Sequence, residues 1–487
     1  MNIFEQSIIG IYIFLNAIQF SYSLNLIYLI FRSLKSKNEI KKIKKITDYP
    51  IVTIQLPTYN EKYVVKRLIE NTVKMDWPKN KLEIQILDDS TDETKKIIKN
   101  IVSKYSKKRF NINHITRKER IGFKAGALQN GLNLCIGEYI AIFDADFIPQ
   151  PDFLKKTIPH FSNDKIGFVQ TRWGYANKDQ SILTKIQSVF LDGHFGIEQS
   201  ARYNGGHFFG FNGTAGIWRK KTIIDAEGWQ HDTLTEDLDL SYRSQLKGWK
   251  TVYVKEIVTP SELPASVNAY RRQQKRWTMG SVECAMKLSK KVVRSNMKLS
   301  NKIQAIYHLF LSFFSVVFLL IILMFPIILY LSTKYKMLNT LTIYSSVLIL
   351  FSFIPSTYFK IARMNLNKKK KNSEIFLASL LGSGFLINTV HAVFSALFLK
   401  NKVFERTPKY GSNNINKNWT NKKYQIKFSP VLKFEILFFI YLIFTFIYSI
   451  KVNNFIYAIY TLMFIFGTSS FVGYSIYQSI KLKASPA

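Results

Sequence analysis

Long apolar stretches at the two ends of the chain constrain its fold most. The first covers residues 8–31, and four more cover 305–331, 338–360, 431–450 and 454–479. About 20 consecutive apolar residues are enough to cross the hydrocarbon core of a bilayer. The sequence therefore predicts a multi-pass membrane protein with five spans, and a soluble domain between the first span and the second.

The placement of charge predicts an orientation. The chain carries 68 Lys and Arg against 32 Asp and Glu, a formal net charge of +36. The excess lies beside apolar segments, as at Arg32, Lys35 and the run 368–371. Cytosolic loops next to membrane spans are enriched in Lys and Arg. We therefore expect the chain to enter the cytosol at residue 32. The expected partner of the basic flanks is a lipid bilayer and not nucleic acid. The expected location is a bacterial inner (plasma) membrane.

Residues 373–399 form a further apolar stretch that charge assigns differently. The stretch contains Glu374, Asn388 and His391. If it crossed the membrane, the following loop would be exported, and that loop has many Lys and Arg but only Glu405 as an acid. Such an export would break the charge rule. We expect 373–399 to be an interfacial or re-entrant cytosolic helix.

The soluble region predicts an α/β domain with a mostly parallel sheet. Apolar, β-branched runs at 52–56, 82–87 and 139–143 are typical of buried strands, and 61–74 and 91–105 have helical spacing. Strands that alternate with helices favour parallel pairing. Ligands of such sheets bind beyond the carboxyl ends of the strands.

The predicted domains are 8–31 (transmembrane), 48–262 (soluble α/β), 263–300 (interfacial helices), 305–360 (two spans), 373–429 (interfacial helix and loop) and 431–479 (two spans).

Two acidic clusters lie where predicted strands end. Asp144 and Asp146 could share one Mg²⁺ or Mn²⁺ with a diphosphate, or could form a solvated turn. Asp88 and Asp89 could hold a ribose, a base or the metal, or could cap the next helix. Each cluster alone leaves both interpretations open.

Further motifs could carry chemistry downstream. Asp237, in Thr-Glu-Asp, could act as a general base or begin a helix. Gln273, Arg276 and Trp277 share one face of a predicted helix, where Arg could bind a diphosphate and the indole a sugar ring. The alternative is an arginine that extends to the membrane surface beside an interfacial tryptophan. Lys124 is a candidate phosphate contact.

Residues 50–285 resemble the processive-type family 2 glycosyltransferases, which include cellulose, mannan and hyaluronan synthases. The resemblance rests on the order of Asp88-Asp89, Asp144-Ala145-Asp146, Thr235-Glu236-Asp237 and Gln273…Arg276-Trp277. The chain looks most similar to cellulose synthase-like glucomannan and glucan synthases. Phe404-Glu405-Arg406-Thr407-Pro408-Lys409 resembles the gating loop of that family.

The resemblance implies a GT-A-like domain and a role for each motif residue. Asp237 would be the catalytic base, and Asp144 and Asp146 would bind Mg²⁺ or Mn²⁺. The donor-binding residues would be Tyr59, Glu61, Asp88, Lys124, Gln273 and Arg276. The acceptor-binding residues would be Trp277, Phe211 and Asn212, and the gating loop would use Phe404, Arg406, Thr407 and Lys409. Phe211 and Asn212 lie in a glycine-rich segment that could instead be an ordinary tight turn.

These observations predict an inverting transferase that moves a hexose from UDP-glucose or GDP-mannose to a growing β-glycan at the cytosolic face. Two alternatives stay open. One is the transfer of a single sugar to a membrane lipid, as in ceramide glucosyltransferases, which have a similar motif set. The other is a non-catalytic membrane or transport protein. The sequence leaves the oligomeric state open.

Overall fold

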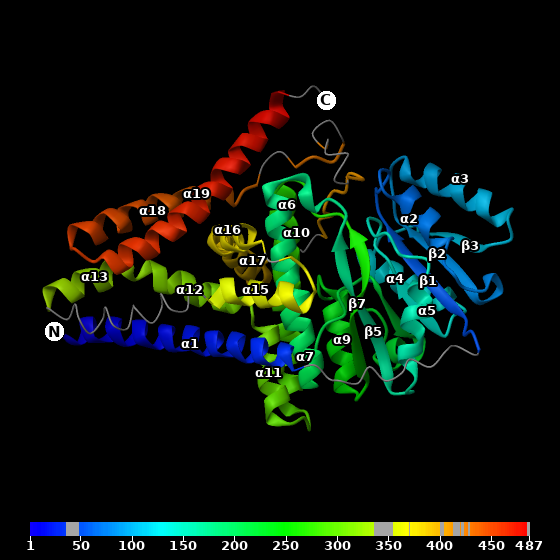
Figure 1. The fold of residues 1–487 in the computed structure, drawn as a ribbon, viewed down its shortest axis with the longest axis horizontal. Coiled ribbons are helices and arrows are strands. Elements are labelled where there is room, and N and C mark those ends of the chain that lie inside the picture. The colour runs from blue at the N-terminus through cyan, green and yellow to red at the C-terminus, as the bar shows by residue number, and fades with distance from the viewer. Residues whose placement is uncertain are drawn as a thin grey trace.

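The computed structural model describes residues 1–35, 48–335, 354–369, 371–399, 404–412, 419, 423–426 and 429–484. A sheet domain lies at one end of the molecule, and a set of long helices extends from it (Figure 1). The strands are β1 (Val52–Thr58), β2 (Leu82–Asp88), β3 (Asn111–Thr116), β4 (Tyr139–Ile142), β5 (Ile166–Tyr175), β6 (Gly216–Arg219) and β7 (Lys250–Ser261).

The helices of the sheet domain are α2 (Val65–Thr72), α3 (Thr94–Ser106), α4 (Phe123–Leu134), α5 (Phe153–Thr157), α6 (Ile182–Gly193), α7 (Ser200–Gly205), α8 (Lys220–Asp225) and α9 (Glu236–Leu246), with short turns η1 (Lys79–Lys81), η2 (Ile158–Phe161), η3 (Lys178–Gln180) and η4 (His194–Gln199). The others are α1 (Ile3–Leu34), α10 (Val267–Arg294), α11 (Leu299–Leu309), α12 (Phe313–Leu323), α13 (Phe325–Lys334), α15 (Ile354–Asn365), α16 (Asn372–Gly382), η5 (Ser383–Phe385), α17 (Leu386–Phe398), α18 (Leu432–Lys451) and α19 (Phe455–Ala484).

The seven strands form one mixed, mostly parallel sheet in the order β3-β2-β1-β4-β6-β5-β7. Strands β1 to β4 pair in parallel, and β6 runs antiparallel to both of its neighbours. The predicted strands 52–56, 82–87 and 139–143 are confirmed as β1, β2 and β4. Side chains of β1 and β2 are almost all buried, because helices cover both faces of the sheet.

The sheet lies between two hydrophobic cores, one on each of its faces. Helices α2, α3 and α5 pack on one face through residues such as Leu68, Ile98 and Phe153. Helices α4, α8 and α9 cover the other face, with Leu128 and Leu240 in a second cluster. This packing fixes the loops that leave the carboxyl ends of β1, β2 and β4, which carry the predicted chemistry.

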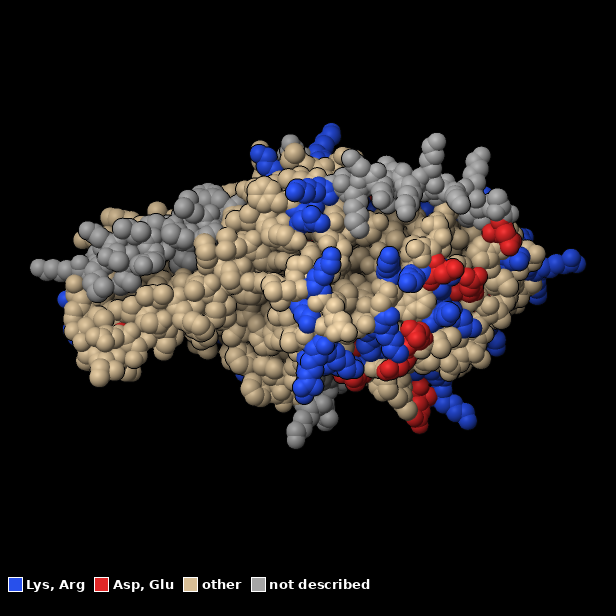
Figure 2. Space-filling view, turned by 90° about the horizontal axis from the view of Figure 1, so that it is seen from below, with Lys and Arg blue, Asp and Glu red and all other residues tan. Residues whose placement is uncertain are grey.

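Four helices are long and apolar enough to cross a membrane, judged by length and composition over the described residues. They are Ile3–Leu34, Asn372–Phe398, Leu432–Lys451 and Phe455–Ile480. Outward-facing side chains on them include Phe14, Ile447 and Ile459, each more than half exposed. In the view from below, this end of the molecule shows few charged side chains, and the charged ones gather toward the sheet domain (Figure 2). Such a surface suits contact with lipid.

The predicted span 305–331 is not one straight helix. α11 and α12 meet at a bend of 65°, so the pair is either a broken fifth span or a re-entrant loop. The two helices pack in different cores, because Leu309 of α11 contacts the cluster around Tyr242, whereas Ile322 of α12 contacts the one around Tyr12. Most of the predicted span 338–360 lies outside the described residues.

The stretch 373–399 consists of α16 and α17, joined at η5. In Figure 1 both are seen nearly end-on, so they run across the direction of α1, α18 and α19. A Cβ on Gly384 would lie 2.5 Å from the carbonyl oxygen of Gly467, so η5 packs backbone to backbone against α19. This orientation favours an interfacial placement, although the stretch is also long and apolar enough to cross. The placement stays a prediction.

Candidate active site

The candidate site is a cleft where β1, β2 and β4 end, closed by α10 and by residues 404–409. All the predicted site residues except two line it: Tyr59, Glu61, Lys124, Asp144, Asp146, Asn212, Asp237, Gln273, Arg276, Trp277, Phe404, Arg406, Thr407 and Lys409. They come from segments more than 300 residues apart in the sequence. The fold therefore brings the ordered motifs into one space.

Asp88 and Phe211 are the exceptions. Asp88 is only 1% exposed, and its carboxylate accepts hydrogen bonds from His114 and from the backbone N–H of Ser90. Although burial opposes them, these bonds hold the pKa of Asp88 below its usual range. Phe211 is also 1% exposed and packs in the core beneath the cleft. Both residues support the wall of the site from behind, and Asp89 lines the cleft in place of Asp88.

The end of the cleft near Tyr59 has a cation that the motifs did not reveal. The guanidinium carbon of Arg120 lies 3.5 Å from the centre of the Tyr59 ring. Arg120 also lies 4.0 Å from Asp89 Oδ2. A flat guanidinium stacked on an aromatic ring offers a surface for a planar ligand. Its position four residues before Lys124 was the only signal for it in the sequence.

Each carboxylate of the D-x-D motif contacts a lysine. Asp144 Oδ1 lies 2.8 Å from Lys124 Nζ, and Asp146 Oδ2 lies 2.7 Å from Lys409 Nζ. Asp146 Oδ2 also accepts the backbone N–H of Glu262 at 3.0 Å. Within the described residues no group of three or more His, Cys, Asp or Glu side chains could hold a metal alone. Asp144 and Asp146 supply hard carboxylate oxygens, the ligand type that Mg²⁺ and Mn²⁺ prefer.

Asp237 lies at the start of α9, in the floor of the cleft. Burial, and then the adjacent Glu236, raise its pKa well above the usual range of an aspartate. Lys124 donates to the carbonyl of Gly213 at 3.0 Å and lies 3.6 Å from Glu236. Gly213 has φ of +76°, and a Cβ there would lie 2.9 Å from Asp237 Oδ2. A glycine is thus needed for the loop to pass this close to the carboxylate.

Helix α10 is predicted correctly and presents Gln273, Arg276 and Trp277 on one face. Burial lowers the pKa of Arg276, while the nearby carboxylates of the cleft oppose this effect. The same helix packs tightly on the Thr-Glu-Asp segment, because a Cβ on Gly280 would lie 2.4 Å from Thr235 Cγ2. This contact sets the distance between the arginine and the acidic floor.

The loop 404–412 is docked into the cleft. Arg406 makes two hydrogen bonds to Glu61, of 2.8 and 2.9 Å, and Lys409 contacts Asp146. The carboxylate of Glu262 accepts the N–H groups of Tyr410 and Ser412. Only about 170 Å³ of the cleft stays free. Ligand pockets usually hold roughly 300–1,000 Å³, so the docked loop leaves less free space than such a pocket has.

Comparison with known proteins agrees with this arrangement. Residues 50–280 match a family described as "Glycosyltransferase like family 2". Residues 217–476, more than half of the 487, match the family described as "Cellulose synthase". This chain belongs to the cellulose synthase family. The resemblance predicted from the motif order is confirmed.

Two curated proteins of similar sequence come from plants. The chain is 44% identical over 275 residues to a probable glucomannan 4-beta-mannosyltransferase 7 of Oryza sativa subsp. japonica, covering 54% of this chain and 46% of that protein. It is 42% identical over 270 residues to glucomannan 4-beta-mannosyltransferase 2 of Arabidopsis thaliana, covering 54% and 51%. The chain thus spans about half the length of the curated relatives it matches.

A solved structure shares the fold. The mannosyltransferase PcManGT from Pyrobaculum calidifontis, in complex with GDP-Man and Mn2+, matches with a TM-score of 0.55 and 18% identity. The match covers 81% of this chain and all of the other. The predicted GT-A-like domain is therefore confirmed for this member of the cellulose synthase family.

Proposed function

We propose that this chain is an inverting membrane glycosyltransferase that moves a hexose from a nucleotide sugar to a growing β-glycan. The observation that carries the proposal is the cleft itself, which places Asp237, the D-x-D pair and the Gln-x-x-Arg-Trp face around one space. The names of the plant relatives favour mannose as the sugar, and GDP-mannose as the donor over UDP-glucose.

In the proposed reaction Asp237 takes the proton of an acceptor hydroxyl, and that oxygen attacks the anomeric carbon in one displacement. The raised pKa of Asp237 suits a general base near neutral pH. Lys124 and Arg276 place positive charge where the nucleoside diphosphate departs. Trp277 offers the acceptor sugar a flat apolar surface.

The carboxylates of Asp144 and Asp146 would hold Mg²⁺ or Mn²⁺. The ion, when bound, supplies charge neutralisation for the diphosphate. In the docked loop Lys409 contacts Asp146. We propose that Lys409 leaves this carboxylate when donor and metal enter, so the loop acts as a gate.

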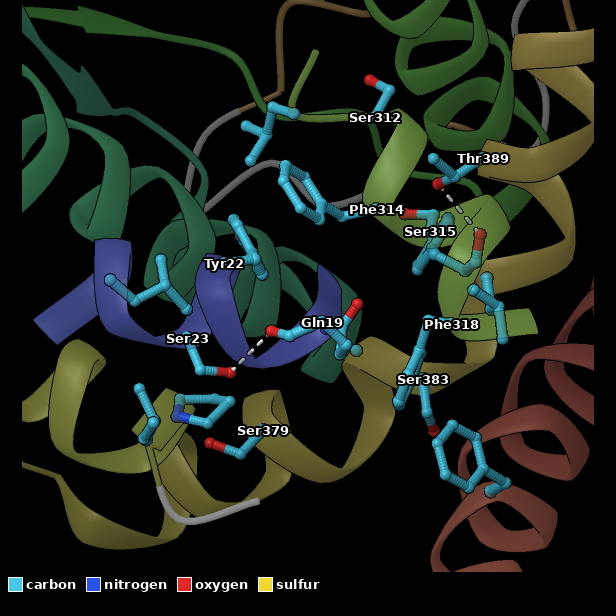
Figure 3. A pocket seen from close by; sticks show the side chains of 18 of the residues that line it. Gln19, Tyr22, Ser23, Ser312, Phe314, Ser315, Phe318, Ser379, Ser383 and Thr389 are labelled. Atoms are coloured by element: carbon cyan, nitrogen blue, oxygen red, sulfur yellow. Dashed lines mark hydrogen bonds between the residues drawn. The ribbon is translucent and has the colours of Figure 1, made fainter. Parts of the chain in front are cut away.

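A large cavity lies among the apolar helices. It has a volume of about 800 Å³ and is lined by α1, α12, α16, α17 and α19. Its wall combines aromatic rings with hydroxyl and amide groups, as Figure 3 shows for Tyr22, Phe314, Ser315, Ser383 and Thr389. Gln274 and Thr278, beside Trp277 on α10, also line the cavity, so we propose that the glycan leaves the cleft along it.

The proposed location is the cytosolic side of a membrane, because the basic flanks of the apolar segments favour that side. The relatives named above are plant proteins, and the bacterial inner membrane stays a prediction.

An Asp237→Asn variant tests the mechanism. We expect loss of transfer with donor binding nearly intact, and transfer at near the wild-type rate would show that Asp237 is not the base.

A further inference from the structure

The turn η4 (His194–Gln199) is π-helical and joins α6 to α7 behind the acceptor side of the cleft. Single π-turns within helices are rare and occur frequently at functional sites. A Cβ on Gly196 would lie 2.5 Å from the carbonyl oxygen of Ala362, so the turn is pressed against α15. Its polar side chains are therefore held in place.

Two of these side chains hold Asn212, which lines the cleft. Asn212 Oδ1 accepts from Gln199 Nε2 at 3.0 Å and from His194 Nε2 at 3.1 Å. Gln199 Nε2 also donates to the carbonyl of Gly210, which fixes how both amides point. The amide nitrogen of Asn212 is buried and has no partner among the described residues. A buried donor without a partner is costly, so the site is prepared for an acceptor atom from a ligand.

Glu198 fixes the orientation of the histidine. His194 Nδ1 donates to Glu198 Oε2 at 3.0 Å, and Arg202 Nε lies 3.4 Å from the other carboxylate oxygen. Burial opposes ionisation, but the bond from His194 and the charge of Arg202 hold the pKa of Glu198 well below its usual range. Glu198 is therefore a carboxylate, and its contact with Nδ1 holds the His194 ring with Nε2 toward Asn212.

An aromatic surface lines the same cleft as this amide. Trp173 lies 6.2 Å from Trp277, ring centre to ring centre, and 5.6 Å from Phe195, the residue after His194. Trp173, Trp277 and Asn212 all line the cleft. A sugar ring stacked on the indoles would thus have hydroxyl oxygens near the Asn212 amide.

We propose that His194, oriented by Glu198, and Gln199 are positioning residues that aim the Asn212 amide N–H at a hydroxyl oxygen of the acceptor sugar. The inference rests on the proposed function and adds to it the residues that seat the acceptor. It assigns a role in acceptor binding to a histidine that contacts neither the donor end of the cleft nor Asp237.

The test compares the purified full-length wild type with His194→Leu, His194→Gln and His160→Gln. The donor is GDP-mannose, or UDP-glucose if only that donor is used, and the acceptor probe is β-1,4-mannotetraose or the corresponding cello-oligosaccharide. For His194→Leu we expect the acceptor KM to rise about tenfold, the factor that corresponds to the loss of one hydrogen bond of about 1.4 kcal/mol. The donor KM should change less than twofold. His194→Gln keeps a donor group and should recover most of the acceptor affinity, and His160→Gln, in η2, should match the wild type.

A double-mutant cycle separates positioning from general damage. In an Asn212→Ala background His194→Leu should add nothing to the acceptor KM, because its effect passes through Asn212. If His194→Leu is not recovered as a folded protein, Glu198→Gln takes its place in the cycle, with a rise of several-fold expected. Additive effects, or an unchanged acceptor KM, would overturn the inference. A wild type that releases no nucleotide from either donor would instead refute the proposed function.

Discussion

The docking of the loop 404–412 allows a quantitative prediction about Arg406. Its guanidinium makes two hydrogen bonds to Glu61, and the two side chains are only 14% and 10% exposed. Breaking a buried ion pair from one side costs about 3–5 kcal/mol. Burial raises the pKa of Glu61 to about 7, so an unpaired Glu61 can take up a proton and part of the cost is avoided. We expect Arg406→Gln to weaken docking by about 2–3 kcal/mol.

Hydrogen exchange of the amides of Tyr410 and Ser412 measures this directly, because both donate to Glu262 only while the loop is docked. In the ligand-free enzyme their protection should fall about 30- to 150-fold. Arg272→Gln is the matched control, since Arg272 pairs with Glu405 of the same loop but is 34% exposed beside a 50% exposed partner. That change should cost less than about 1 kcal/mol. Equal effects of the two variants, or unchanged protection in Arg406→Gln, would refute the reasoning.

Three further predictions concern the site and its support. The charge of Glu236 helps to raise the pKa of Asp237, so Glu236→Gln should lower that pKa. The acid limb of the kcat–pH profile should then move to lower pH. An acid limb that stays in place would contradict the coupling of the two carboxylates. Asp146→Ala should abolish the difference in donor affinity measured by calorimetry with and without Mn²⁺, and a surviving metal dependence would exclude Asp146 as a ligand. Arg271 and Glu435 are 2% and 1% exposed and form an ion pair that joins α10 to α18. Arg271→Met should lower the free energy of unfolding by about 3–5 kcal/mol, because it leaves Glu435 buried without its partner. Thermal unfolding of the double variant Arg271→Met, Glu435→Met should show that most of this loss is regained.

Strands β1, β2 and β4 were predictable because apolar, β-branched runs end there in turn-forming or acidic residues. β3 was not, because its sequence Asn-Ile-Asn-His-Ile-Thr is largely polar and it pairs only with β2 at the sheet edge. β6 has four residues and depends on antiparallel neighbours from distant segments. The bend between α11 and α12 reflects two separate cores, which an apolar run does not reveal.

For the site, the motif order predicted most of the residues that line the cleft. It could not separate Asp88 from Asp89, because which of two adjacent side chains faces the cleft depends on how strand β2 ends. It gave no signal for the Tyr59–Arg120 stack, nor for the contact of Lys409 with Asp146, which joins segments 263 residues apart. Such contacts depend on tertiary packing and not on local pattern.

We propose that this cleft builds a β-glycan from a nucleotide hexose. The most direct measurement is a panel of radiolabelled donors, including GDP-mannose and UDP-glucose, with the purified protein in Mn²⁺, scored for released nucleotide and for product size. We predict nucleoside diphosphate release from one of these donors, coupled to a polymer that grows with time and is degraded by a β-glycanase, and no product from Asp237→Asn. A single organic-extractable glycolipid, or no release from any donor, would contradict the account.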